Sequence, residues 1–319
     1  MKNSLSQPIQ EAFHPGEQLL QERLGVRARM NELGPKVIRD HMPEQHRELF
    51  EKLPILMIGA LDKESRPWTT LLTGQPGFVQ APDSFHLEVK ANPVPFDPVL
   101  NQLKTGSNIG LLGIELETRR RNRMNAEITQ FKNGKLKLKV KQSFGNCPRY
   151  IHKRQHVWQK QEMQKTTTKQ FDRFDDEIAG ILQDADSFFI SSLFDDGTDH
   201  FNRGVDVSHR GGLPGFIQVD DDRTLTFPDY SGNRFFNTLG NITLNPLTGL
   251  LFIHYPTADL LHLTGRAEIL WDDADIQAFP DAERLVRFTL DQAQLVSHAL
   301  PLTWDFLEYS PQLLKSQHR

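Results

Sequence analysis

The sequence has very little cysteine, because Cys147 is the single thiol among 319 residues. One thiol excludes an internal disulfide and indicates a reducing compartment, so we expect a cytoplasmic protein. The chain also lacks any apolar run of about 18 residues, the length that a membrane-spanning helix needs. Its first 17 residues have no apolar core of the kind found in secretory signal peptides. We therefore expect no membrane partner.

Several catalytic and metal-binding patterns are missing as well. There is no Cys/His framework for zinc, and His152 and His156, which would share a helix face, have no third ligand nearby. We expect no metal site and a solvent-exposed histidine pair. The chain has no P-loop, no dinucleotide-binding GxGxxG and no Ser/His/Asp nucleophile set. A net charge of -4 gives no reason to expect nucleic acid as a partner.

What the sequence does contain is a series of short apolar runs separated by Gly, Pro, Asn and Asp. This pattern is typical of a strand meander, and 38% apolar with 24% charged residues fits a globular protein with a sizeable core. Strands are predicted at 55–62, 68–74, 77–81, 85–90, 109–116, 121–131 and 136–144, with a second set between 187 and 269. The Asn133-Gly134 pair predicts a hairpin turn before the strand at 136–144.

Helices are predicted around and between these strands. The first covers 17–33, with a break near Gly25 and an end at Gly34-Pro35, and the second covers 36–53, with an interruption at Met42-Pro43. The polar segment 148–165 has a helical pattern, and the threonine-rich segment 166–169 is the expected linker. Further helices are predicted at 171–185 and 282–295. The segment 302–309 is either a last strand or an extended tail.

An internal repeat indicates the domain organisation. GQPGFVQAPD (74–83) and GLPGFIQVDD (212–221) share six of ten residues at an offset of 138. GLLGI (110–114) matches GLLFI (249–253), and NAEI (125–128) matches RAEI (266–269), in the same order. Three ordered matches indicate a duplication. We expect an N-terminal helical segment over 1–53, a first β-rich domain over 54–165 and a second over 166–319.

The phrases SHRGGLPGF, FPDYSGNRFFNTLGNI, NPLTGLLFI and LTGRAEI carry a family resemblance. They resemble the bacterial branch of the pyridoxamine 5'-phosphate oxidase-like, flavin-binding split-barrel superfamily. RRRNRMN and QSFGNCPRYI are similar to its tandem-barrel form, and the resemblance spans roughly 13–310. It implies a mainly β fold with flanking helices (α+β), in which two tandem split β-barrels pack as a pseudo-dimer. Flavin mononucleotide (FMN) would then lie in the groove between the barrels.

The second copy carries the residues expected to hold the cofactor. An arginine fork matches phosphate oxygens, and glycines allow close backbone approach. The expected set is Ser208, His209, Arg210, Gly211, Tyr230, Asn233, Arg234 and Asn237. Ser208 and Arg210 could instead form an ordinary polar strand end, Asn233 and Arg234 could cap the following helix, and Asn237 could be structural. In the first copy, 70–73 replaces the cationic cradle, so one FMN per chain is expected, with a phosphate site degenerate in that copy.

The first copy is expected to supply the opposite wall. The resemblance places Ser143 and Asn146 near the flavin ring, with Tyr150 toward the substrate. Arg121, Arg123 and Asn125 share one strand face that could meet an anionic substrate or could be a solvated basic strand. Cys147 could be redox-active or, as the more common case, a lone buried thiol.

We expect an FMN-dependent oxidoreductase acting on an unidentified small-molecule substrate. NAD(P)H or a separate reductase would supply electrons, because the chain shows no reductase module of its own, and a homodimer could form. The alternative is a non-catalytic flavin carrier, or a barrel that binds haem or deazaflavin. Haem would need an axial ligand, for which His209, His254 and His262 are the candidates.

Overall fold

The computed structural model describes residues 11–90, 93–132, 134–159, 165–198, 200–272 and 274–314. It begins with three helices, α1 (Pro15–Arg23), α2 (Arg27–Val37) and α3 (Glu44–Lys52). The expected break near Gly25 is confirmed, since this residue has a φ of 66° between α1 and α2. The expected end at Gly34-Pro35 is wrong, because Pro35 lies inside the last turn of α2. The second expected helix begins only at Glu44.

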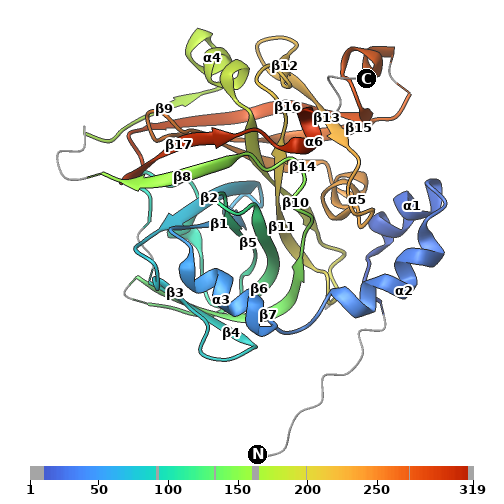
Figure 1. Cartoon of the computed structure of the whole chain (residues 1–319), viewed down its shortest axis with the longest axis vertical. Helices are drawn as coiled ribbons and strands as arrows, with labels where there is room; N and C mark the ends of the chain where they lie inside the picture. Colours follow the sequence, from blue (N-terminus) through green and yellow to red (C-terminus); the bar gives the residue numbers. More distant parts are fainter. Residues whose placement is uncertain are drawn as a thin grey trace, which may run out of the picture.

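A seven-stranded antiparallel sheet follows, in the order β2-β1-β5-β6-β7-β4-β3 (Figure 1). Its strands lie close to the expected positions: β1 (Ile55–Leu61), β2 (Pro67–Thr73), β3 (Val79–Gln80), β4 (His86–Lys90), β5 (Asn108–Glu115), β6 (Arg120–Lys132) and β7 (Lys135–Gly145). The alternation that predicted them is visible in β7, where Leu136 and Leu138 are buried and Lys137 between them is exposed. β6 and β7 form the expected hairpin, although Asn133 in its turn lies outside the described residues.

The second part of the chain builds an eight-stranded sheet, in the order β11-β10-β14-β15-β16-β13-β12, with β9 beside β16. Seven of its strands repeat the order of the first sheet. The strands are β9 (Thr167–Phe171), β10 (Ser187–Phe194), β11 (Gly204–Gly211), β12 (Gln218–Val219), β13 (Thr224–Tyr230), β14 (Leu247–His254), β15 (Asp259–Leu270) and β16 (Ala282–Ser297). The expected helix at 171–185 is α4 (Asp176–Asp184), which precedes β10, and α5 (Asn237–Leu244) precedes β14. The remaining short helices are η1 (Leu100–Gln102), η2 (Ala274–Ala278) and α6 (Pro311–Leu314).

The two sheets also share their pairing register. Leu112 lies opposite Met57 in the first sheet, and Leu251 lies opposite Phe189 in the second. The matched GLLGI and GLLFI segments therefore occupy equivalent places. The matched GFVQA and GFIQV segments contribute β3 and β12, the strands at the same end of the two orders.

The third sequence match, NAEI with RAEI, does not follow the register. In the first sheet, Ala126 lies opposite Ile109. Thr248 is the counterpart of Ile109 in the second sheet, and Gly265 lies opposite it. The ladders thus align Ala126 with Gly265 rather than with Ala267. Both strands also change register at a bulge here, so the shared letters do not mark equivalent positions.

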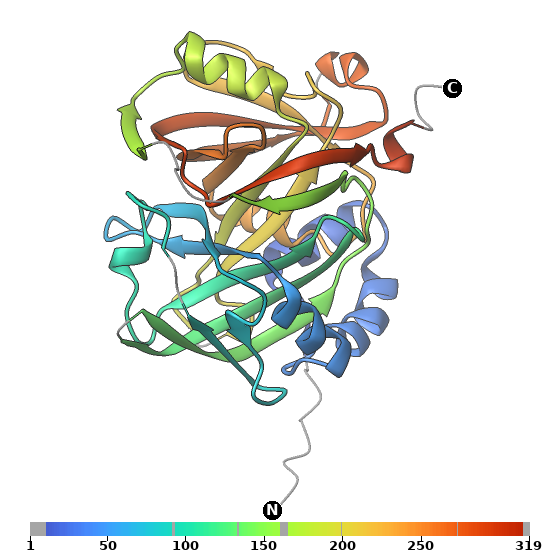
Figure 2. The ribbon, with the colours of Figure 1, turned by 60° about the vertical axis from the view of Figure 1, so that its left-hand side comes forward.

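The two sheets pack face to face through reciprocal contacts (Figure 2). β5 packs against β11, and the equivalent β14 packs against β2. A Cβ on Gly110 would lie 2.4 Å from the Val205 carbonyl oxygen, and one on Gly249 would lie 2.5 Å from that of Pro67. Val205 and Pro67 have equivalent places in β11 and β2. A pair of equivalent barrels related by an approximate two-fold axis predicts this reciprocity.

Three expectations outside the main strands are wrong. The polar segment 148–165 contains the strand β8 (Lys153–Trp158), which pairs with β17 (Leu302–Glu308). The expected linker at 166–169 enters β9, and the expected helix at 282–295 is β16. Strand partners supply the backbone hydrogen bonds in each case, and the local sequence does not encode those partners. The strand alternative for 302–309 is confirmed. The domain boundaries stay predictions, and β8 from the expected first domain pairs with β17 from the expected second.

The helices lie outside the sheets. α1 packs against α5, and Glu17 on α1 accepts a hydrogen bond from the Asn237 side chain at the start of α5. The N-terminal segment therefore supports the helix that borders the pocket described below. Within the described ranges, none of the helices is long and apolar enough to cross a membrane.

Candidate functional site

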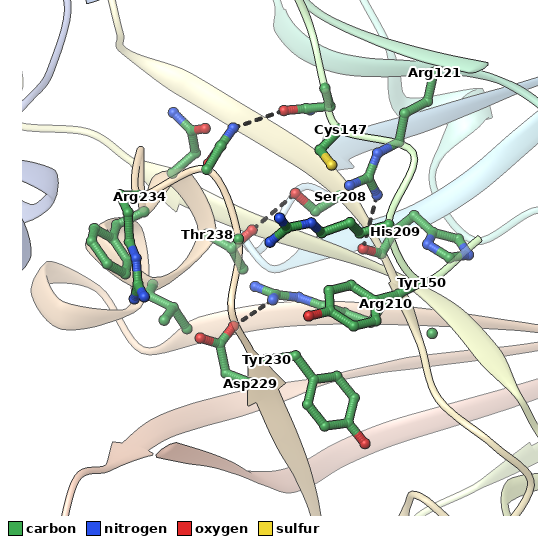
Figure 3. A pocket seen from close by; sticks show the side chains of 18 of the residues that line it. Arg121, Cys147, Tyr150, Ser208, His209, Arg210, Asp229, Tyr230, Arg234 and Thr238 are labelled. Atoms are coloured by element: carbon green, nitrogen blue, oxygen red, sulfur yellow. Dashed lines mark hydrogen bonds and ion pairs between the residues drawn. The ribbon is translucent and has the colours of Figure 1, made fainter. Parts of the chain in front are cut away.

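A pocket of about 120 Å³ lies where the end of β11 meets the segment 146–150 from the first half of the chain (Figure 3). β6, β13 and the first turn of α5 complete its walls. Most of the residues predicted to bind cofactor or substrate line it: Arg121, Arg123, Asn146, Tyr150, Ser208, His209, Arg210, Gly211, Tyr230, Asn233, Arg234 and Asn237. Segments far apart in the sequence thus meet in one cavity.

Two predicted residues do not line this pocket. Ser143 is buried, its hydroxyl lies 3.0 Å from Nδ1 of His46 on α3, and its backbone bridges to Arg39. Strand alternation turns Ser143 toward α3, whereas Asn146 lies beyond the end of β7 and reaches the pocket. Asn125 is also buried, farther along β6 than Arg121 and Arg123.

The start of α5 forms one wall of the pocket without a side-chain cap. Phe236 at the N-cap has a φ of 65°, and Arg234 has a φ of 66°, so a left-handed turn leads into the helix. The predicted alternative, capping by Asn233 and Arg234, is wrong. Asn233 accepts from the Phe235 N–H and donates to Asn146, while Arg234 binds Glu283. The first N–H groups of α5 therefore remain available to an anion.

Two hydroxyl groups lie beside this helix start. Thr238 in the first turn donates a hydrogen bond to Ser208 Oγ on β11, across 3.1 Å. The Ser208 proton is left without an acceptor in the described part of the chain, so it can be donated to a ligand. This places one strand hydroxyl and one helix hydroxyl at the same wall.

The two arginines expected to bind phosphate are paired with carboxylates. Arg210 Nη1 lies 2.5 Å from Asp229 Oδ1. Arg234 binds both carboxylate oxygens of Glu283 at 2.5 Å, and this hydrogen bonding raises the pKa of Arg234. Arg284, behind them, contacts both acids. The positive charges of Arg210 and Arg234 are therefore largely compensated within the protein.

Arg121 and Arg149 carry the uncompensated charge of the pocket. Arg121 has no carboxylate ion pair in the described part of the chain and donates only to the His209 carbonyl, at 3.4 Å. Burial and the neighbouring Arg123 lower the pKa of Arg121 to about 10. Arg149 is exposed at the rim. Arg123 is 4% exposed and forms an ion pair with Asp206. Its Nη1 also donates a hydrogen bond to Asn237 Oδ1, 3.1 Å away. With five lining arginines and two lining carboxylates, the pocket favours an anion.

His209 and Gly211 both line the pocket, and each also has a structural property that the sequence does not show. His209 is 6% exposed, and burial, with the charge of Arg121, lowers its pKa well below 6.5. Its imidazole is neutral, and Nδ1 has no hydrogen-bond partner among the described residues. A Cβ on Gly211 would lie 2.0 Å from the Tyr150 carbonyl oxygen. Gly211 therefore admits the crossing segment of the first half of the chain.

Two stacked tyrosines border the pocket. The rings of Tyr150 and Tyr230 lie 5.1 Å apart at 27°, and the Tyr150 hydroxyl donates to the Ser231 carbonyl at 3.0 Å. Burial and the neighbouring Tyr150 raise the pKa of Tyr230 to about 12, so both phenols remain protonated at neutral pH. Beyond them lies a second, larger cavity that shares these two side chains. The pair thus separates two cavities.

Two predictions about titratable side chains change. Cys147 is half-buried and lines the pocket, whereas the sequence favoured a buried lone thiol. His152, expected to be exposed, is 1% exposed, because its Nδ1 accepts from the Ser310 N–H and its Nε2 donates to the Gly212 carbonyl. His156 instead lies beside Glu117. In the described segments, no group of three or more metal-ligating side chains is present.

Sequence reasoning missed the acidic residues and one hydroxyl of the site. Asp229 compensates the charge of Arg210, and Glu283 compensates that of Arg234. Thr238 contributes the hydroxyl group on α5. Asp229 stands in the quoted phrase FPDYSGNRFF, beside Tyr230, so its position was a usable signal. Glu283 lies on a segment predicted to be helical, and no local pattern connects it to Arg234.

The first barrel has a carboxylate at the corresponding place. Thr70 and Ser208 occupy equivalent positions in β2 and β11. Thr70 donates to Asp97 Oδ2, and Asp97 Oδ1 accepts from the N–H groups of Val99 and Leu100, at 2.8 and 2.7 Å, at the start of η1. In the first barrel, the Asp97 carboxylate therefore lies between a strand hydroxyl and a helix start. In the described part of the second barrel, no carboxylate occupies the equivalent position.

Residues 174–297 match the family described as pyridoxamine 5'-phosphate oxidase. None of the curated proteins matches the chain. Similar solved structures include general stress protein 26 from Bacillus anthracis, with 14% identity over 41% of this chain and 96% of that one, at a TM-score of 0.27. Others are a protein related to general stress protein 26 from Clostridium acetobutylicum (13%, 41% and 92%, 0.28) and an FAD-binding protein from Mesorhizobium loti (12%, 41% and 97%, 0.27). The matched region includes β10 to β16 and α5, so the second half of the chain is similar to the pyridoxamine 5'-phosphate oxidase family.

Proposed function

We propose that this chain binds one flavin mononucleotide in the pocket beside α5 and uses it as an oxidoreductase acting on a small molecule. The observation that carries this proposal is the difference between the two barrels. Asp97 supplies the first barrel with a carboxylate on a helix start and on Thr70. Among the described residues, no carboxylate is hydrogen-bonded to the equivalent Ser208 hydroxyl or caps the start of α5. A phosphate would supply the missing anion.

The residues present fit a phosphate well. The N–H groups of α5, the Ser208 hydroxyl and the guanidinium of Arg121 converge on one pocket with an excess of arginine. Arg210 and Arg234 would add their remaining donors at the edge. Charge-assisted bonds of this kind are stronger than neutral ones, so the phosphate group would supply most of the binding selectivity.

The flavin ring needs more room than the phosphate. Small-molecule sites usually measure about 300–1,000 Å³, and this pocket measures about 120 Å³. Tyr150 and Tyr230 are two of the four side chains that this pocket shares with the larger neighbouring cavity. We therefore expect this pair to separate when flavin binds, and their apolar ring faces to pack against the ring system.

Flavin, when bound, supplies hydride and electron transfer, and the protein supplies binding and orientation. Arg121 places a positive charge without a carboxylate partner in the pocket, so it would favour a negatively charged, reduced cofactor or an anionic group beside it. Tyr150 and the segment around it cover the pocket from the first half of the chain and restrict water. His209 is neutral and can hold a proton on one ring nitrogen only.

Two of the three expected haem ligands have other contacts. His262 is buried and its Nδ1 donates to the Thr69 carbonyl, 3.0 Å away. His254 lies 2.7 Å from the Thr257 hydroxyl. As parts of the flavin proposal, we retain reduction by NAD(P)H or by a separate reductase and a cytoplasmic setting, without a nucleic acid or membrane partner. A homodimer remains one possible assembly.

Titration with FMN and riboflavin tests the cofactor proposal. We expect a flavin spectrum from the purified protein and at least about a hundredfold preference for FMN over riboflavin, because riboflavin lacks the phosphate. Equal affinities would contradict the assignment of the phosphate site. Stopped-flow reduction with NADH, NADPH and dithionite tests the reaction. A flavin that resists every biological reductant but transfers readily to an apo-flavoenzyme would identify a carrier.

Tyr150→Phe offers a sharper test of the role of the first half of the chain. It removes one hydrogen bond, to the Ser231 carbonyl, and keeps the stacked ring. We expect FMN affinity within about fivefold of wild type, with an altered rate of substrate-dependent reduction or reoxidation. Asn146→Ala should behave in the same way. If both variants change only the retention of flavin, the enzyme proposal loses its support.

A further inference from the structure

The cavity beyond the tyrosine pair has a volume of about 1080 Å³ and is walled mostly by the second half of the chain. The loop between β11 and β12, α4, the turn before β16 and α6 form its sides. Apolar side chains predominate in its lining, among them Leu213, Phe216, Ile217, Val219, Phe279 and Leu313. The first half contributes Tyr150. A cavity of this size and composition is typical of a site for an organic small molecule.

Its charge is opposite to that of the neighbouring pocket. Asp281 and Glu283 line the large cavity, and its lining contains no lysine, arginine or histidine among the described residues. Glu283 is held by Arg234 and Arg284. Asp281 is exposed and has no ion pair in the described part of the chain. Negative charge in a ligand would therefore meet a carboxylate and find no cation in this cavity.

The two cavities share four side chains, namely Tyr150, Phe216, Tyr230 and Glu283. A ligand in the large cavity would thus contact the same tyrosines that border the arginine-lined pocket. The Tyr150 side chain contacts the second half through its hydroxyl and its ring stack, while its backbone N–H donates to Ser310. A change in the side chain alone can therefore connect the two spaces.

We propose that the large cavity is the substrate site and that the substrate is an apolar ring compound without negative charge. The assignment of this ligand as a substrate rests on the proposed flavin function. Its chemical class rests on the cavity itself. The anionic part of the complex would occupy the arginine-lined pocket, and the apolar, uncharged or cationic part would occupy the space beyond the tyrosines.

Three probes with one ring system and different charges test the class. They are naphthalene-2-methanol, 2-naphthylmethylammonium and 2-naphthoate, measured by calorimetry with the full chain, with and without FMN. We expect the alcohol and the ammonium to bind at least about tenfold more tightly than the carboxylate. Equal or tighter binding of 2-naphthoate, or no binding of any probe, would overturn the proposal.

A pair of tryptophan variants on α4 tests the place. Ala179 lines the cavity, while the next residue, Gly180, does not, and an added Cβ there would meet no atom within 4 Å. Ala179→Trp should weaken binding of naphthalene-2-methanol by about tenfold or more, and Gly180→Trp should leave it unchanged. Both variants should keep wild-type FMN affinity and unfolding temperature. Equal effects of the two substitutions on the probe would contradict the site.

The outcomes separate this inference from the flavin proposal. If the probes bind as expected but FMN does not, the cavity assignment stands and the flavin proposal fails. If FMN binds and the probes do not, the flavin proposal stands and the cavity assignment fails. With both bound, flavin should quench the naphthyl fluorescence, because the two cavities share a wall. Absence of quenching would refute the substrate role.

Discussion

The two barrels differ at one equivalent position, where a strand hydroxyl lies beside the start of a helix. In the first, Asp97 binds Thr70 and two N–H groups at the start of η1. In the second, Phe236 stands at the N-cap of α5, and Ser208, the counterpart of Thr70, contacts Thr238 instead. The same scaffold thus has an internal carboxylate in one copy and an uncapped helix start in the other. One carboxylate of the protein can therefore accept the hydrogen bonds that would otherwise bind an external anion.

The surrounding charges differ in the same sense. Arg123 lies opposite Leu112, and the residue at the equivalent place, opposite Leu251, is His262. Burial lowers the pKa of His262, and the charge of Asp97 acts in the opposite direction. The internal acid of the first barrel therefore has a neutral imidazole beside it, supplied by His262 of the second barrel. The pocket beside α5 has an arginine instead, Arg123 of the first barrel, and more cations than acids.

The largest expected effect comes from making the second barrel resemble the first. Phe236→Asp places a carboxylate at the N-cap of α5, where Asp tolerates the observed φ of 65°. The acid would cap the helix and repel phosphate, so FMN affinity should fall by about a hundredfold or more. Phe236→Asn is the matched control, which caps without charge and should lose less. Fluorescence titration of both variants measures the difference, and equal losses would remove the electrostatic explanation.

A smaller effect is expected from Arg234→Ala. Truncation leaves Glu283 without the partner that binds both its oxygens, close to the expected phosphate. FMN affinity should therefore fall by about ten- to a hundredfold, while riboflavin affinity changes little. Arg266→Ala, at an exposed arginine of the same sheet, serves as the control. Unchanged FMN binding in Arg234→Ala would show that the ion pair, rather than the cofactor, is the function of this arginine.

The strands and most of the pocket residues could be predicted from the sequence because both depend on local patterns. Alternation in LKLKVK identified β7, and the turn phrases identified Ser208 and Arg234. The failures have a common cause. Strands β8 and β16 have polar or mixed sequences. β8 pairs with the distant β17, and β16 pairs with β13 and β9 as well as with the preceding β15. Ser143 lies on β7 and faces α3, whereas Asn146 lies beyond the end of that strand, and the sequence phrase does not reveal this difference.

The charge balance of the site could not be predicted for a similar reason. Arg210 and Arg234 looked like free phosphate ligands because Asp229 and Glu283 reach them only in the folded sheet. Asp97 likewise lies in the proline-rich segment 93–98, which contains no recognisable motif. Its role is visible only from its contacts with Thr70 and the start of η1.

A third prediction concerns the internal acid of the first barrel. Asp97→Asn keeps the shape of the side chain but removes the charge that accepts two N–H bonds. The free energy of unfolding should fall by about 1–2 kcal/mol, as for the loss of a helix cap. FMN affinity should not change, because Asp97 lies outside the pocket. Chemical denaturation measures the loss, with Asp305→Asn on an exposed strand position as control. A loss of FMN binding without a loss of stability would contradict the separation of the two positions.

The smallest expected effect lies in the helices that precede the two sheets. α3 ends shortly before β1, as α4 does before β10, and the two helices have the same length. Counting from these ends, His46 corresponds to Ile178, and both are buried. Burial, with the charges of Arg39 and Arg120, lowers the pKa of His46 from 6.5 to about 4. The second barrel has no titratable group at this place.

This difference predicts a pH dependence with a defined sign. Between pH 6.5 and 4 the unfolded chain binds a proton at His46 and the native protein does not, so the free energy of unfolding falls as the solution is acidified. His46→Gln should reduce that loss by at most about 1.4 kcal/mol per pH unit, and above pH 6.5 it should have no pH-dependent effect. Denaturation midpoints at pH 7.5, 6.0 and 5.0, compared with the exposed His86→Gln, measure this share. An unchanged acid slope in His46→Gln would mean that other buried histidines, such as His14 and His209, carry the dependence instead.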